Sequence, residues 1–108
     1  MNRLLLAGFL VAAGSVAIAQ APPPLDAWTV EHFERARTAQ ARKDLDTAAE
    51  EYRLVLTRNP RFAEVYMNLG IVYQLQSRYP EAIKAFTEAL AIKPALPGAR
   101  VQIGRAHV

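Results

Sequence analysis

Few side chains in this sequence are of the types that carry acid–base or nucleophilic chemistry. The chain has two histidines, His32 and His107, and no cysteine. The lack of cysteine excludes disulfides, thiolate metal sites and a cysteine nucleophile. No phosphate-binding glycine loop, catalytic serine set or second metal ligand accompanies His32, and a single helical histidine is usually structural or solvated.

Carboxylates occur in two close groups that could act as an acid–base pair or as oxygen ligands for a cation. Asp44 and Asp46 stand where two expected helices meet, so turn and capping roles explain them better than a metal site. Glu50 and Glu51 follow on a helix, where we expect a solvated face. The sequence therefore predicts no enzyme activity, no metal site and no cofactor.

Residues 1–19 are typical of a secretory signal peptide. Arg3 gives a positive start, an apolar run follows from Leu4, and Ala17-Ile18-Ala19 is a small-x-small cleavage triplet. We predict cleavage after Ala19 and a periplasmic or secreted mature chain that begins at Gln20. The alternative is a retained anchor, but the 16 residues from Leu4 to Ala19 are fewer than the roughly 20 that span a bilayer.

The charge of the chain does not indicate a nucleic-acid partner. There are 13 basic and 10 acidic residues, and removal of Arg3 with the signal peptide leaves 12 basic residues and a net charge of +2. No glycine-rich RNA-binding sequence or zinc-ligand spacing accompanies them. We expect a solvated helix surface of mixed charge, no nucleic-acid partner, and no membrane contact after cleavage.

The mature region is expected to be helical after a proline-rich spacer, residues 20–25. Strong helix formers dominate from Leu25 to Asn59 without glycine or proline. Asp26 can cap the first helix, Pro80 suits the first turn of the fourth, and an X-Pro pair ends the second and the fourth. We predict four helices, over residues 27–41, 46–58, 62–76 and 80–92.

Similar residues recur at a spacing of 34, which is the period of a helix-pair repeat. The matched residues are Ala36 and Gly70, Ala48 and Ala82, Tyr52 and Phe86, Leu56 and Leu90, and Pro60 and Pro94. Gly70 and Ala82 are small, as required where two helices cross closely, and Leu69, Tyr73 and Phe86 recur at helical spacing beside them. Ala89 leaves room for the first helix of a following repeat.

The second repeat reads Tyr66-x-x-Leu69-Gly70-x-x-Tyr73, then Ala82-x-x-x-Phe86-x-x-Ala89 and Pro94. This pattern resembles the tetratricopeptide repeat, with Tyr66 in place of the usual tryptophan. The first repeat resembles the family less, because His32 and Arg35 stand where large apolar residues are usual. The resemblance implies an all-α solenoid of antiparallel helix pairs, stacked in a right-handed array, over residues 26–101. Repeat 1 covers residues 29–62, repeat 2 covers residues 63–96, and a third begins at residues 97–101.

The last residues, Gln102 to Val108, resemble the translation of a common sequencing adapter in one reading frame. We interpret residues 102–108 as a non-native tail, in which Arg105 and His107 have no function. On this interpretation the protein continues past Val101 with further repeats. The alternative is a genuine third repeat, because Gly104 lies one full repeat length after Gly70.

The resemblance also implies a binding groove, because the first helix of each pair lines a concave surface in this family. On that basis the groove residues are Val30, Phe33, Arg37 and Gln40 from repeat 1, and Glu64, Met67, Ile71 and Gln74 from repeat 2. These mixed apolar, amide and charged groups suit a peptide with one or two hydrophobic anchors. The alternative is that the large apolar members simply pack between repeats.

Some members of the family hold a partner's C-terminal carboxylate with lysine and asparagine side chains. Asn68 matches one asparagine, but Phe33 and Arg37 stand where a lysine and a second asparagine are needed. We therefore expect no carboxylate clamp. The leading hypothesis is an exported adaptor that binds a protein or peptide partner, and the alternatives are the repeat region of a longer enzyme and a repeat protein that self-associates.

Overall fold

The computed structural model describes residues 24–106, in which the regular structure is helical and no strand occurs. The helices are α2 (Ala27–Ala41), α3 (Leu45–Arg58), α4 (Ala63–Leu75), α5 (Tyr79–Ile92) and α6 (Ala99–Ala106). The first predicted helix matches at both ends, and the other three differ by one residue at some ends. The predicted signal peptide, most of the spacer, and residues 107–108 lie outside the described residues.

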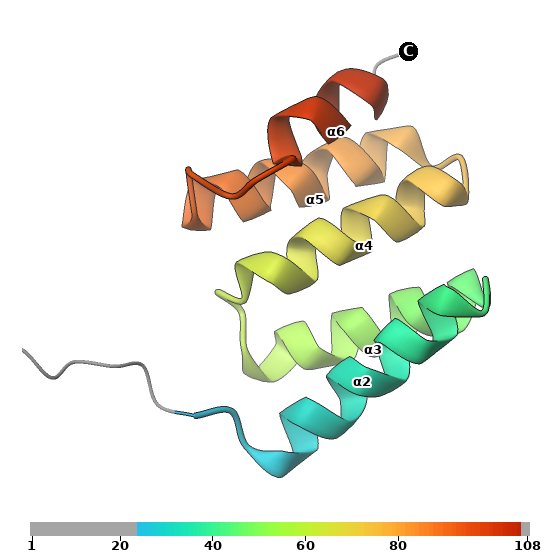
Figure 1. The fold of residues 1–108 in the computed structure, drawn as a ribbon, viewed down its shortest axis with the longest axis vertical. Coiled ribbons are helices and arrows are strands. Elements are labelled where there is room, and N and C mark those ends of the chain that lie inside the picture. Colours follow the sequence, from blue (N-terminus) through green and yellow to red (C-terminus); the bar gives the residue numbers. More distant parts are fainter. Residues whose placement is uncertain (1–23, 107–108) are drawn as a thin grey trace, which may run out of the picture.

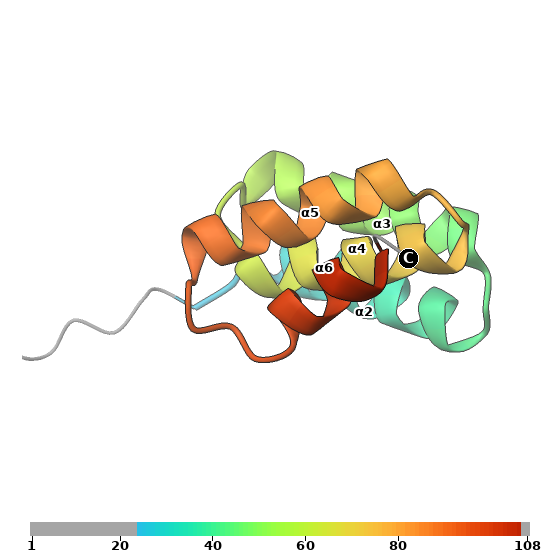
Figure 2. The ribbon, with the colours of Figure 1, turned by 90° about the horizontal axis from the view of Figure 1, so that it is seen from above.

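The helices follow one another as antiparallel pairs, α2 with α3 and α4 with α5, and α6 packs mainly on α5 (Figure 1). Seen from above, α2, α4 and α6 form one layer and α3 and α5 the other (Figure 2). This is the predicted all-α array of tandem helix pairs. Helix α6 continues through Gln102, where we place the start of the non-native tail. The structure does not test the assignment of this tail, which stays a prediction.

The turn inside each pair has the same backbone geometry at equivalent positions of the two repeats. Lys43 and Ser77 both adopt left-handed φ angles, 64° and 62°. In both turns the following N–H group bonds back to the helix: Asp44 donates to the carbonyl of Ala39 at 2.9 Å, and Arg78 to that of Tyr73 at 2.8 Å. This is a Schellman ending, which satisfies carbonyl groups that a helix C-terminus leaves open.

Three further helix ends are fixed by capping or by proline. The Asp26 carboxylate accepts a 2.8 Å hydrogen bond from the backbone N–H of Thr29, as predicted for an N-cap. Pro80 lies in the first turn of α5, where no N–H is needed. Asn59 ends α3 before Pro60, and its side-chain amide donates to the Thr29 hydroxyl at 2.9 Å, which ties the two ends of repeat 1 together.

The core lies between the helices of each pair and between the pairs. Tyr52 of α3 and Phe86 of α5 occupy equivalent positions and are both 0% exposed. A Cβ atom placed on Gly70 would lie only 2.5 Å from the Phe86 ring, so glycine is what allows α4 and α5 to approach this closely. Ala82, the other predicted crossing residue, and the matching Ala36 and Ala48 of repeat 1 are likewise completely buried.

Candidate partner-binding face

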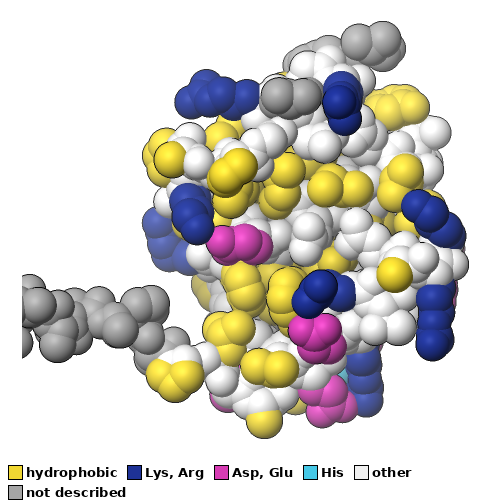
Figure 3. All heavy atoms as spheres, viewed as in Figure 1, with side chains coloured by type: hydrophobic (Ala, Val, Ile, Leu, Met, Phe, Trp, Pro, Cys, Tyr) yellow, Lys and Arg dark blue, Asp and Glu magenta, His cyan; other side chains and the backbone are white. Residues whose placement is uncertain are grey.

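The layer of α2, α4 and α6 presents one broad surface, which we name the α2–α4–α6 face. Figure 3 shows this surface, with apolar side chains spread across it and lysine and arginine side chains mostly toward its edges. The eight residues predicted to line a groove come from α2 and α4, which lie in this layer. Their positions decide how much of this surface is open to a partner.

In repeat 1 the predicted residues divide between exposure and packing. Val30 is 44% exposed, whereas Phe33 is half-buried, with its ring centroid 5.3 Å from that of Phe62, the N-cap residue of α4. The Arg37 guanidinium lies 5.9 Å from the Phe33 ring centroid and is exposed. Gln40 is half-buried, and its side-chain oxygen accepts a 2.6 Å hydrogen bond from the Tyr52 hydroxyl.

In repeat 2 the apolar members are also half-buried. Met67 and Ile71 both pack against the main core cluster, and Met67 also contacts the smaller cluster around Ala89 and Leu96. Packing was the alternative to a binding role for Phe33, Met67 and Ile71. It accounts for the buried part of each of these side chains. The remaining part stays exposed on the α2–α4–α6 face. Gln74 is half-buried in the last turn of α4.

Two ionisable groups, Glu64 and Tyr52, have shifted pKa values. Lys93 donates a 3.0 Å hydrogen bond to the exposed Glu64 carboxylate, and this contact lowers the pKa of Glu64. Burial raises the pKa of the Tyr52 phenol to about 12, because the ionised form would lose its hydration. Tyr52 therefore stays neutral at ordinary pH and donates its hydroxyl hydrogen bond to Gln40.

A depression of about 370 Å³ between α2 and α4 adds residues that the sequence did not place in the groove. Lys43 and Asn68 line it together with Arg37 and Gln40. Lys43 reaches this position because the left-handed turn after α2 folds it back beside the helix end. The repeated turn position, at Lys43 and Ser77, is the feature of the sequence that could have indicated this placement.

A second groove, of about 440 Å³, lies on the opposite side, between α3 and α5 with α4 as its floor. Its floor and walls include Leu56, Tyr66, Leu69 and Tyr73, and Arg53 donates a 3.1 Å hydrogen bond to the Tyr73 hydroxyl. Three helices from both repeats build this α3–α5 groove, and the signature residues that we assigned to packing line it. No pattern in the sequence indicated a binding role for this groove.

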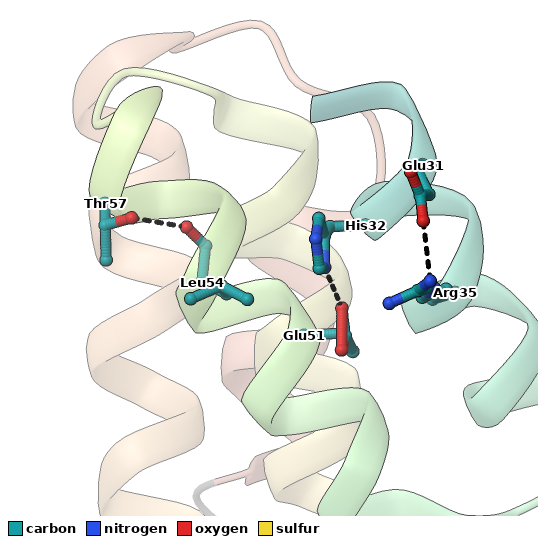
Figure 4. A network of polar contacts seen from close by, with 6 residues as sticks. All are labelled: Glu31, His32, Arg35, Glu51, Leu54 and Thr57. Atoms are coloured by element: carbon teal, nitrogen blue, oxygen red, sulfur yellow. Dashed lines mark hydrogen bonds and ion pairs between the residues drawn. The ribbon is translucent and has the colours of Figure 1, made fainter. Parts of the chain in front are cut away.

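The structure corrects the prediction that Glu51 belongs to a solvated face. Glu51 lies 2.5 Å from the Nδ1 atom of His32, and the two side chains are only 18% and 14% exposed (Figure 4). The Trp28 ring packs against His32 in a tilted arrangement, with 4.4 Å between the ring centroids. Glu50 is exposed, as expected. His32 therefore has a structural role in joining α2 to α3, which is the role expected of a single helical histidine.

Asp44 and Asp46, at the turn between α2 and α3, do not make the capping contacts that were predicted for them. Asp44 is the N-cap residue of α3, but its side chain makes no capping hydrogen bond. Asp46 instead accepts a 2.7 Å hydrogen bond from the Gln76 side chain of the next repeat. Among residues 24–106 no cluster of His, Asp or Glu side chains could hold a metal ion. In the same range no helix is long and apolar enough to cross a membrane.

These features define an all-α protein built from tandem antiparallel helix pairs. Residues 63–96, which comprise α4, α5 and the loop that follows, match the model of the tetratricopeptide repeat family. The matched segment has the same bounds as repeat 2. No curated protein matches the chain. Tetratricopeptide repeats are generally protein–protein interaction modules, and their fold is usually non-enzymatic.

Proposed function

We propose that this chain is an exported interaction module that binds a segment of a partner protein on the α2–α4–α6 face, without chemistry of its own. The observation that carries the proposal is the grouping of Phe33, Met67 and Ile71. These half-exposed apolar side chains come from two neighbouring helices of a packed scaffold and have amide side chains beside them. Such a surface suits one or two apolar anchors of an extended peptide or an amphipathic helix.

The charged groups give the face a direction. Arg37 and Lys43 lie near the C-terminal end of α2, whereas Glu64 lies in the first turn of α4, at the opposite edge of the layer. Because α2 and α4 run in the same direction (Figure 1), Arg37 and Lys43 lie at one end of the apolar surface and the Glu64–Lys93 pair lies at the other. A partner segment with acidic residues on one side of its apolar anchors would match this arrangement.

A displayed random-peptide library selected against residues 20–108 tests the binding proposal. Peptides that bind should lose at least about tenfold in affinity when Met67 is replaced by lysine, which corresponds to about 1.4 kcal/mol. The matched control is Lys84→Glu in the α3–α5 groove, with helicity of both variants checked by circular dichroism. Selected peptides that tolerate Met67→Lys but fail on Lys84→Glu would move the binding site to the α3–α5 groove.

Export is a separate part of the proposal, supported by the composition of residues 1–19. The whole chain, expressed in a bacterium with two membranes, should be recovered from the periplasm. Mass spectrometry of the recovered protein should give Gln20 as its first residue. Recovery from the membrane fraction with an intact N-terminus would favour the retained anchor instead, and recovery from the cytoplasm would refute export.

A further inference from the structure

A hollow of about 760 Å³ lies at the end of the molecule where α3 and α5 finish and α4 begins. We name it the end pocket. Its apolar lining comes from three segments of the chain, which supply Leu25 before α2, Pro60 and Phe62 before α4, and Ile92 at the end of α5. Leu25 is 44% exposed, and Phe62 and Ile92 are half-buried. Apolar surface on all three segments is therefore open to a ligand.

The end pocket is continuous with the α2–α4–α6 face. Phe62 lines the pocket and also packs against Phe33 of that face, with 5.3 Å between the ring centroids. Glu64, one of the predicted groove residues, lines the pocket as well. A partner segment that lies over Met67 and Ile71 can therefore reach the end pocket.

The charged groups around the end pocket are mainly basic. Arg58, Arg61 and Lys93 line it, and among the described residues Glu64 is the one acid in its lining. Lys93 and Glu64 compensate each other through their 3.0 Å contact. Arg58 lies 3.7 Å from the Asp26 carboxylate, whereas Arg61 is exposed and makes no ion pair within residues 24–106. The pocket therefore carries an excess of positive charge, and Figure 3 shows basic side chains along this edge of the face.

An apolar pocket with excess cations at its rim favours a ligand that carries an apolar side chain beside a carboxylate. Burial of the apolar group in the pocket is favourable because it removes apolar surface from water. The carboxylate meets a positive rim, whereas a basic neighbour would be repelled by the same rim. Because the pocket opens onto the α2–α4–α6 face, a longer segment fits it better than an isolated small molecule does.

We propose that the end pocket holds a second apolar anchor of the partner segment, and that an acidic residue next to this anchor contacts Arg58 and Arg61. This inference rests on the proposed function, because the first anchor lies over Met67 and Ile71 on the α2–α4–α6 face. It adds the class of partner, which is a segment with two apolar anchors and an acid beside the one that enters the end pocket.

Two displayed peptide libraries, selected against residues 20–108, test the charge of the partner. Both have two fixed apolar residues at varied spacing, flanked by Asp and Glu in one library and by Lys and Arg in the other. We expect binders from the acidic library, with an affinity that falls at least about fivefold in Arg61→Glu. Lys84→Glu, the matched charge reversal in the α3–α5 groove, should leave the affinity unchanged. Binding should weaken as the salt concentration rises.

A second pair of variants tests the apolar lining. Leu25→Ser removes an exposed apolar side chain from the pocket and should weaken the selected peptides. Leu75→Ser is the matched control, because Leu75 is 48% exposed at the last residue of α4, which is the other end of that helix. This control should leave the affinity unchanged. Circular dichroism confirms that each variant is folded.

The outcomes separate this inference from the proposed function. Peptides that lose affinity in Met67→Lys but tolerate both Arg61→Glu and Leu25→Ser would overturn the end pocket and leave binding on the α2–α4–α6 face intact. Peptides that lose affinity in Arg61→Glu and Leu25→Ser but tolerate Met67→Lys would support the end pocket and count against that face. Binders from the basic library alone, or from neither library, would overturn the inference.

Discussion

Repeats 1 and 2 share their backbone but not the chemistry of one face. Both have a Schellman turn with a left-handed residue, a proline after the second helix, and a large aromatic ring at the centre of the pair. They differ at His32 and Tyr66, and at Arg35 and Leu69. Turn and crossing residues are therefore enough to set the geometry of a helix pair. The large apolar residues of the signature are needed only where another helix packs on them.

The strongest test of this comparison is loss of the ring at the centre of repeat 2. Phe86→Ala removes a completely buried side chain beside Gly70, so we expect a loss of about 3–5 kcal/mol in the free energy of unfolding. That is a large part of the roughly 5–15 kcal/mol typical of a domain. Urea denaturation measures it, with Tyr79→Ala on the 43% exposed Tyr79 as control. Equal midpoints for Phe86→Ala and the wild type would refute this account of the core.

The second test concerns the glycine at the crossing of α4 and α5. In Gly70→Ala the new Cβ atom would meet the Phe86 ring at 2.5 Å, and the buried ring must move. We expect a destabilisation of about 1–3 kcal/mol, although alanine is the better helix former. Gly104→Ala in α6 is the matched control, because within the described part of the chain nothing beyond its own helix lies within 4 Å of its Cβ position. Gly104→Ala should be neutral or stabilising, and equal thermal shifts in the two variants would contradict the crossing argument.

Much of the fold could be predicted because local residue types decide it. Asp26, Pro80 and the two X-Pro pairs mark helix ends through backbone chemistry alone, and the spacing of 34 places the crossing residues. The His32–Glu51 contact could not be predicted in this way, because it joins residues 19 apart on two helices whose relative rotation is tertiary. The α3–α5 groove was missed for the same reason, since three helices build it.

The candidate face was predicted only in outline. The resemblance placed all eight groove residues on the first helices of the pairs, which are α2 and α4 in the structure, but it could not say how much of Phe33 or Met67 packing would leave exposed. That amount depends on contacts with Phe62 at the start of α4 and with the loop before α6, which lie far along the chain from Phe33 and Met67. The depression beside Lys43 depends on a left-handed turn at a residue type that rarely adopts one.

A smaller effect is expected from the polar contact that distinguishes repeat 1. Glu51→Ala gives position 51 the residue type of its repeat 2 equivalent, Ala85, but leaves His32 without its carboxylate partner. We expect a loss of about 1–2 kcal/mol, because both side chains are largely buried and one is charged. Glu50→Ala, at the exposed neighbouring position, should change the free energy of unfolding by less than about 0.5 kcal/mol. Equal melting temperatures for the two variants would mean that the His32–Glu51 contact stabilises the fold no more than a surface ion pair does.

The central rings give the finest comparison, because Tyr52 carries a hydroxyl that Phe86 lacks. Tyr52→Phe removes the 2.6 Å hydrogen bond to Gln40, so at pH 7 we expect a loss of about 0.5–1.5 kcal/mol. Burial raises the pKa of folded Tyr52 from 10.0 to about 12, so between these values the unfolded chain releases the phenol proton while the folded chain keeps it. The stability contributed by Tyr52 is therefore complete below pH 10 and is lost as pH rises toward 12. Denaturation at pH 7, 10 and 11 should show the advantage of the wild type over Tyr52→Phe beginning to shrink by pH 10 and shrinking mostly between pH 10 and 11, whereas a constant difference would mean that the phenol ionises equally in both states.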